Sequence, residues 1–219
     1  HELDGFLERL DTWVDPKLQP SLGSASGVAL HLFLACEEDA EMRAKITAAV
    51  ARLPWLGRWF SDVRVTFLNM AAEVDYYIKG TSLNVFCNKS GPNLFWLMVM
   101  AGCRDYAYTF QMEADCLPLR AGWLDALDRA ITCSTPGSWF IGANYAGPTL
   151  ASPTNAFHVN GNAIYATAAR AFQPFLEQEF LDALAWLISK VSNNIAYDVA
   201  YAQGIARYDA LLKATGIDL

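Results

Sequence analysis

Short apolar segments alternate along this chain with segments of helical periodicity, and that alternation restricts the folds open to it. Apolar or β-branched runs bounded by turn or charged residues predict strands. They occupy residues 27–35, 63–69, 81–87, 106–112, 138–143 and 157–165, the last as strand, turn and strand. Apolar residues at helical spacing predict helices over residues 39–53, 93–103, 122–131, 180–191 and 196–214. Strands alternating with such helices predict an α/β sandwich with a largely parallel sheet.

Length and composition favour one domain with a large apolar core. The chain has 219 residues, of which 53% are hydrophobic and 18% are charged, and this balance excludes a disordered or low-complexity chain. We therefore expect a single domain over residues 1–219, with residues 1–26 as an N-terminal extension. Because the chain starts at His1 rather than Met, we also expect it to be a piece of a longer protein.

Charge and cysteine content restrict the partners and the compartment. The 16 basic and 23 acidic residues give a formal net charge of −7, so we expect no basic surface for nucleic acid. The longest apolar run, residues 94–103, is about half as long as a membrane-spanning helix, so we expect no transmembrane segment. The five cysteines form no C-x-x-C pair. They predict free thiols in a reducing compartment, and hence a cytoplasmic location.

A pair of carboxylates, Glu113 and Asp115, follows the aromatic strand expected at residues 106–112. Where a strand runs into a loop, two carboxylates with one residue between them can both turn toward one cation. Mg²⁺ and Mn²⁺ prefer such oxygen ligands. The alternative is an ordinary polar loop, in which Asp favours a turn. The motif alone leaves both interpretations open.

His158 and Asp198 are the next candidates. His158 stands beside an Asn-Gly-Asn sequence that is typical of a tight turn. Its imidazole can complete a carboxylate site for Mn²⁺, or it can form a hydrogen bond near the turn. Asp198 lies near the start of the last expected helix. There a carboxylate either caps the helix or acts as a general base over a site.

Further polar residues can either bind a ligand or serve the fold. Glu37, Glu38 and Asp39 follow the first expected strand. They either begin a helix, which we favour, or contact a sugar or base. Lys89 and Asn93 lie at the head of the helix expected at residues 93–103, where a phosphate or a base edge can bind. Both are equally compatible with a solvated loop.

Several common catalytic motifs are absent from the sequence. It contains no phosphate-binding P-loop, no dinucleotide-binding glycine fingerprint, no nucleophile elbow and no H-E-x-x-H. The chain therefore lacks the usual marks of an ATPase, a dehydrogenase, a serine esterase and a zinc protease.

Residues 90–123 (SGPNLFWLMVMAGCRDYAYTFQMEADCLPLRAGW) resemble part of a known family. Their order of helix, aromatic strand, acid-x-Asp, Pro-containing loop and Gly-Trp helix start resembles the D-x-D region of GT-A fold nucleotide-sugar glycosyltransferases. Glu113 stands in place of the first Asp. Residues 158–165 (HVNGNAIY) are similar to the part of these enzymes where a later His joins the metal. Asp198 matches the acidic base of inverting members, and compact viral and bacterial members have a similar length.

The resemblance implies a fold, a reaction and a set of site residues. The implied fold is a GT-A-like α/β/α sandwich with a mixed, mostly parallel central sheet. The implied reaction transfers a hexosyl or pentosyl group, with inversion, from a nucleotide-diphosphate sugar to a hydroxyl of a glycan or other acceptor. We expect a UDP-linked donor. The implied site consists of Glu113, Asp115 and His158 as ligands of Mn²⁺ or Mg²⁺, Asp198 as base, and Ala35, Cys36, Glu37, Lys89, Asn93 and Ala114 around the nucleotide.

Two other functions stay open at this point. A sugar nucleotidyltransferase usually carries a Gly-rich, basic loop after its first strand, and residues 35–38 (ACEE) contain none. A carbohydrate-binding or scaffold domain can keep the fold without turnover. Stabilisation by Mn²⁺ together with UDP would favour the enzyme, because a ligand that binds the native state raises its apparent stability.

Overall fold

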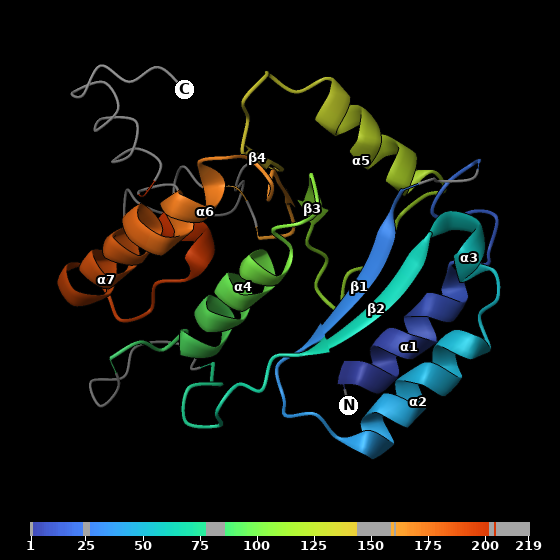
Figure 1. Ribbon diagram of the computed structural model, residues 1–219, viewed down its shortest axis with the longest axis horizontal. Helices are drawn as coiled ribbons and strands as arrows, with labels where there is room; N and C mark the ends of the chain where they lie inside the picture. The colour runs from blue at the N-terminus through green and yellow to red at the C-terminus, as the bar shows by residue number, and fades with distance from the viewer. Residues whose placement is uncertain are drawn as a thin grey trace. The chain divides into compact units, whose positions relative to one another are not determined.

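The computed structural model describes residues 2–23, 27–77, 86–143, 159, 161–201 and 204. The fold class is mixed α/β, as the sequence predicts, and it includes a small parallel sheet. The chain divides into two compact units, and most of their helices and strands are labelled in Figure 1. The first unit comprises His1–Met70 and Met112–Thr135, and the second unit comprises Ala71–Gln111 and Pro136–Leu219.

The first unit combines helices with a pair of parallel strands. Its elements are α1 (Glu2–Thr12), β1 (Ala29–Leu34), α2 (Ala40–Ala51), α3 (Leu56–Trp59), β2 (Asp62–Phe67) and α5 (Trp123–Thr132). In the parallel pair, Ala29 lies opposite Asp62 and Leu34 lies opposite Phe67. Parallel strands need a crossover connection, and α2 and α3 provide it between β1 and β2 (Figure 1).

Apolar residues from α1, α3 and the segments beside them form the core of the first unit. Its buried members are Leu10, Trp13, Leu53, Leu56, Trp59 and Phe60. Leu30 of β1 and Val63 of β2 lie opposite one another and pack against this cluster. Trp123 and Leu124 at the start of α5 pack against it as well. The residues that the sequence assigned to an N-terminal extension thus supply part of this core.

The second unit contains an antiparallel sheet and several helices. Its elements are α4 (Ser90–Gly102), β3 (Thr109–Phe110), β4 (Phe140–Ile141), β5 (Ile164–Tyr165), α6 (Phe172–Phe175), the π-helix η2 (Leu176–Phe180) and α7 (Leu181–Lys190). The strand order is β3–β5–β4, with Thr109 and Phe140 both opposite Tyr165. Residues 197–201 form a further helical turn.

The core of the second unit is built around Trp96 of α4, which is fully buried. Its ring stacks on Tyr197 with 5.1 Å between ring centroids and an interplanar angle of 10°. The same ring contacts Tyr165 of β5 edge-on, with 5.6 Å between centroids. Phe140 of β4 stacks on Tyr201 at 4.5 Å. Aromatic contacts therefore join α4, the antiparallel sheet and the turn at residues 197–201.

The structure confirms the strands predicted at residues 27–35 and 63–69, which pair in parallel. It also confirms the helices predicted at residues 39–53, 93–103, 122–131 and 180–191. The strands expected at residues 106–112 and 138–143 are present with two residues each, and they belong to an antiparallel sheet. Residues 78–85 and 144–158 lie outside the described part of the chain. They include most of the strand expected at residues 81–87.

Candidate functional site

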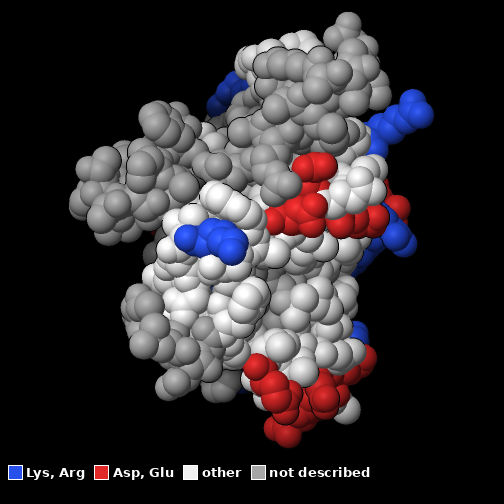
Figure 2. Space-filling view, turned by 90° about the vertical axis from the view of Figure 1, so that its left-hand side faces the viewer, with Lys and Arg blue, Asp and Glu red and all other residues white. Residues whose placement is uncertain are grey.

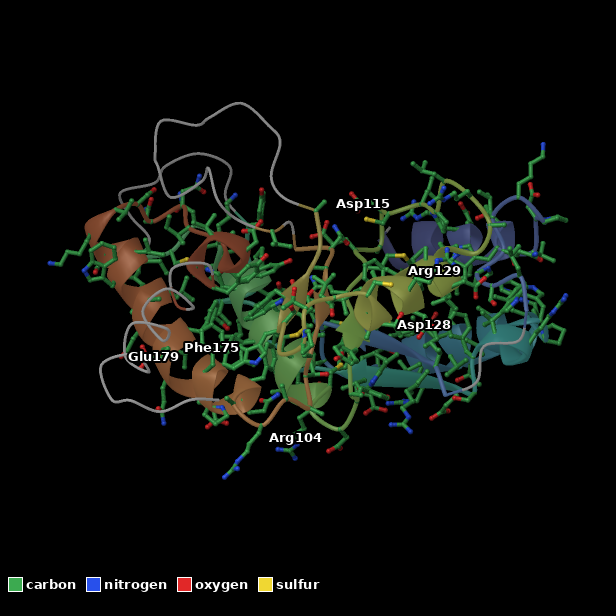
Figure 3. The ribbon with its side chains drawn as sticks, turned by 90° about the horizontal axis from the view of Figure 1, so that it is seen from above. Arg104, Asp115, Asp128, Arg129, Phe175 and Glu179 are labelled. Atoms are coloured by element: carbon green, nitrogen blue, oxygen red, sulfur yellow. The ribbon has the colours of Figure 1, made fainter. Side chains whose placement is uncertain are left out.

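Glu113, Asp115 and Cys116, which we call the acidic cluster, lie together in the first unit. One ligand atom from each side chain, a carboxylate oxygen or the thiol sulfur, lies within 4.8 Å of the other two. Glu113 and Asp115 are exposed, and Cys116 is half-buried. Figure 3 shows Asp115 apart from Asp128 and Arg129, the labelled charged side chains of α5. The structure thus brings the two carboxylates that were predicted as metal ligands together with a thiol that was not predicted as one.

A tight turn brings these side chains together. The backbone N–H of Cys116 donates to the carbonyl of Glu113 at 3.0 Å, which closes a four-residue turn with Ala114 and Asp115 at its centre. The chain reverses there, so that side chains from the first, third and fourth positions lie close to one another. The presence of Asp in such a turn agrees with its ordinary turn preference. Turn formation and cation binding are therefore compatible in this segment.

The charges of the acidic cluster act on its thiol. Burial raises the pKa of Cys116 most, and the negative charges of Glu113 and Asp115 raise it further. Arg9 of α1 opposes them and lowers it. The raised pKa keeps Cys116 protonated at neutral pH. The thiol is therefore not in the thiolate form, which is the form that binds metals.

The donor set of the acidic cluster suits a hard divalent cation. Carboxylate oxygens are the ligands that Mg²⁺ and Mn²⁺ prefer, and exposed carboxylates leave coordination positions open to water and to phosphate oxygens. Cys116 would have to lose its proton in order to bind. Glu113 and Asp115 therefore fit as the ligands of Mn²⁺ or Mg²⁺, with Cys116 beside them.

The segment that follows β1 is held by backbone bonds to the end of β2. The carbonyl of Ala35 accepts from the N–H of Met70 at 2.8 Å, and that of Cys36 accepts from the N–H of Asn69 at 3.3 Å. Glu37 is exposed, and α2 begins three residues further on. The helix start that we favoured for this segment is therefore present. Nucleotide contact by Ala35, Cys36 and Glu37 stays a prediction.

Lys89 and Asn93 lie at the start of α4 in the second unit, and both are largely buried. The side-chain amide of Asn93 donates to the carbonyl of Ile195 at 3.0 Å, so it supports the loop before the 197–201 turn. The Lys89 Nζ atom lies 3.4 Å from the centre of the Tyr77 ring, a cation–π contact. Both side chains thus have structural contacts, and their contact with a phosphate or base stays a prediction.

Asp198 lies in the helical turn at residues 197–201 and is half-buried. Burial raises the pKa of Tyr165 and of Tyr201, and the charge of Asp198 adds to the increase in both. The carboxylate therefore lies within electrostatic reach of two phenol groups in the core of the second unit. A role as general base stays a prediction, and His158 lies outside the described residues.

Surface charge follows the composition of the chain. Figure 2 shows acidic side chains gathered in patches on the face in view, in keeping with the formal net charge of −7. Among the described helices, none is both long and apolar enough to cross a membrane.

The candidate residues are divided between the two units. Ala35, Cys36, Glu37 and the segment from Glu113 to Cys116 belong to the first unit, and Lys89, Asn93 and Asp198 belong to the second. Among the described residues, the structure brings together the possible metal-ligand atoms of the acidic cluster. The chain matches no known family model, no curated protein and no solved structure.

Proposed function

We propose that this chain is a metal-dependent glycosyltransferase. It would transfer a hexosyl or pentosyl group from a nucleotide-diphosphate sugar, UDP-linked, to a hydroxyl of a glycan or other acceptor. The observation that carries the proposal is the acidic cluster, in which two carboxylates and a thiol lie within 4.8 Å of one another in the loop that follows β3. The proposal includes a GT-A-like α/β/α sandwich with a mixed, mostly parallel central sheet.

The chemistry accounts for the types of residue involved. The acceptor oxygen attacks the anomeric carbon, the bond from that carbon to the diphosphate oxygen breaks, and the nucleoside diphosphate leaves with the electron pair. A bound Mn²⁺ or Mg²⁺ ion supplies neutralisation of the charge that develops on this leaving group. Glu113 and Asp115 hold the ion, with His158 as the third proposed ligand. Asp198 takes the proton from the acceptor hydroxyl, which leads to inversion.

The remaining proposed roles concern the nucleotide and the compartment. Ala35, Cys36, Glu37, Lys89, Asn93 and Ala114 are the proposed nucleotide contacts. A cytoplasmic location belongs to the same proposal, and it is supported by the five cysteines, which are all free thiols.

Thermal unfolding of the chain with Mn²⁺, with UDP and with both together tests the proposal. A ligand present at 100 times its dissociation constant stabilises the native state by about 2.7 kcal/mol, and Tm rises accordingly. We expect the largest rise with Mn²⁺ and UDP together, because an ion held by Glu113 and Asp115 would neutralise the charge of the diphosphate. Asp115→Asn removes a ligand charge, and we expect it to abolish this rise.

Asp128→Asn is the matched control, since Asp128 is also an exposed aspartate of the first unit and lies apart from Asp115 in Figure 3. We expect it to keep the full rise in Tm. A panel of UDP-sugars, assayed for hydrolysis with Mn²⁺, then identifies the donor, and Asp115→Asn should lose nearly all turnover. Equal stabilisation and turnover in the Asp115 variant would mean that the motif is a polar turn. Stabilisation without any turnover would favour a binding or scaffold domain.

A further inference from the structure

In the second unit, the segment that ends at Tyr77 is held against the start of α4. The hydroxyl of Ser90 donates to the carbonyl of Val74 at 2.7 Å, and the backbone N–H of Gly91 donates to the carbonyl of Tyr76 at 3.0 Å. A Cβ atom added to Gly91 would lie 2.9 Å from the backbone of Tyr76. The glycine therefore allows the segment to approach the helix this closely.

The ring of Tyr77 is held from one side by a buried ammonium group. Lys89, the N-cap residue of α4, is 7% exposed, and its Nζ atom lies 3.4 Å from the centre of the ring. This cation–π contact occupies one face of the ring. Tyr77 is nevertheless 56% exposed, so solvent reaches its other face and its edge. The ring is thus in place before a ligand arrives, and such preorganisation lowers the cost of binding.

A second exposed ring, that of Phe86, belongs to the same end of α4. Phe86 lies three residues before Lys89 and is 70% exposed. We call Tyr77 and Phe86 the aromatic patch. Aromatic side chains bring a large contact area to a binding surface at a low cost in conformational entropy. The aromatic patch therefore offers flat apolar surface to a ligand at the start of α4.

Carboxylates accompany the aromatic patch. Asp75 and Glu73 are exposed on the segment that ends at Tyr77. One carboxylate oxygen of Asp75 lies 3.0 Å from the position that a Cβ atom of Gly91 would take, so this group lies beside the first turn of α4. The core of a protein–protein interface is depleted of Asp and Glu. A ligand that combines an apolar face with hydroxyl groups suits this arrangement better than a protein partner does.

A pyranose sugar has this combination of groups. When its hydroxyls are equatorial, its axial C–H groups form an apolar face that can stack on an aromatic ring. Its hydroxyls can donate hydrogen bonds to an ionised carboxylate, which accepts only. We propose that the aromatic patch binds a neutral oligosaccharide of such sugars, by stacking on Tyr77 and by hydrogen bonds to Asp75. This inference goes beyond the proposed function, because the binding needs neither a divalent cation nor a nucleotide.

The test uses cellotetraose, a β-linked glucose oligomer whose ring hydroxyls are all equatorial. Saturation-transfer NMR of the full chain, without metal or nucleotide, should show the strongest transfer to the axial ring protons. A titration followed by the same signal gives the dissociation constant. Tyr77→Ala should raise this constant about tenfold, as truncation of an aromatic residue at the centre of a binding surface does. Tyr77→Phe keeps the ring over Lys89 and should bind within about twofold of wild type.

Asp75→Ala tests the carboxylate and serves as a second variant if Tyr77→Ala does not fold. We expect weaker binding of cellotetraose, because hydrogen bonds to a charged group are lost. Tyr108→Ala is the matched control for the ring. Tyr108 is also an exposed tyrosine of the second unit, at 42%, and it directly precedes β3. This control should keep the wild-type affinity.

Three results would overturn the proposal. They are unchanged affinity in Tyr77→Ala, an equal loss in Tyr108→Ala, and displacement of cellotetraose by UDP, which would assign the ring to a nucleotide site. Absence of cellotetraose binding by the wild-type chain would also overturn it and would leave the glycosyltransferase proposal standing, since Mn²⁺ and UDP test that proposal separately. Binding of cellotetraose by a chain that Mn²⁺ and UDP do not stabilise would support the aromatic patch and contradict the glycosyltransferase.

Discussion

His31 of β1 is surrounded by groups that disfavour its charged form. Its Nε2 atom lies 2.8 Å from the hydroxyl oxygen of Thr66, and its ring stacks on Phe33 with 4.0 Å between centroids. Burial lowers the pKa of His31 from its usual 6.5, and the positive charge of Arg64 lowers it further, against a smaller opposing effect of Asp62. The folded chain therefore takes up this proton at a lower pH than the unfolded chain.

This difference predicts a loss of stability in acid. As the pH falls below about 6.5, the unfolded state binds more protons than the folded state, so the free energy of unfolding decreases. The contribution of His31 is complete above that pH and is lost as the pH falls through the folded pKa. Urea unfolding between about pH 7.5 and about pH 5 should show a shallower decrease in His31→Gln than in wild type. Equal slopes in the two proteins would contradict the assignment to His31.

At the scale of single residues, the sequence predicted contacts that depend on neighbours along the chain. Glu113 and Asp115 are separated by one residue, so a turn of ordinary geometry is enough to bring them together. The carboxylate pattern did not indicate Cys116, because Mg²⁺ and Mn²⁺ prefer oxygen ligands, although the thiol directly follows Asp115. Contacts between distant residues are different. The side-chain amide of Gln111 donates a hydrogen bond to the hydroxyl of Tyr197, 86 positions further along the chain, and nothing local in the sequence indicates this bond.

At the scale of single elements, α2 shows a helix start that the sequence predicts and the structure explains. Asp39 is the N-cap, with extended backbone angles, and its carboxylate accepts from the N–H of Glu41 at 2.7 Å and of Met42 at 3.3 Å. These N–H groups have no partner within the helix, so the cap supplies one.

We expect Asp39→Ala to lower the free energy of unfolding by about 1 kcal/mol, because the cap hydrogen bonds are lost. Asp39→Asn keeps an acceptor oxygen at the same place and should retain most of the stability. Urea unfolding of the three proteins, with equal dependence on denaturant, measures the difference. If Asn cost as much as Ala, the stabilisation would come from the negative charge rather than from the cap geometry.

The lengths of β3 and β4 were overestimated because strand length depends on the strand with which each one pairs. β3 and β4 have two residues each because both pair with β5, which is two residues long. Pro174 lies in the first turn of α6, where proline is tolerated because its missing N–H needs no partner. The helical segment predicted at residues 180–191 begins earlier in the structure than the sequence indicates, because α6 and η2 directly precede α7.

At the scale of the whole molecule, the five cysteines differ in accessibility. Cys36 and Cys133 are exposed, Cys116 is half-buried with a raised pKa, and Cys87 and Cys103 are buried. Burial also raises the pKa of Cys103. Because the thiolate is the reactive form, exposure and pKa together determine the rate of modification.

We expect a thiol reagent at neutral pH to modify two cysteines rapidly, Cys116 more slowly, and the two buried cysteines only as the chain unfolds. All five should react at once in denaturant, since none is in a disulfide. Peptide mapping of the modified sites over time makes the measurement. Rapid modification of Cys87 or Cys103 in the native protein would contradict the cores described above.

The division of the chain also bears on the order in which it can fold during synthesis. The first unit uses residues on both sides of α4 and β3, since it stops at Met70 and resumes at Met112. Its α1 core includes Trp13, whose ring contacts Trp123 with 5.1 Å between centroids. A nascent chain that ends at Met70 therefore still has part of this apolar surface open to water. The first unit can therefore complete its core only after α5 has left the ribosome. By then α4 and β3, which precede α5 in the sequence, have already emerged.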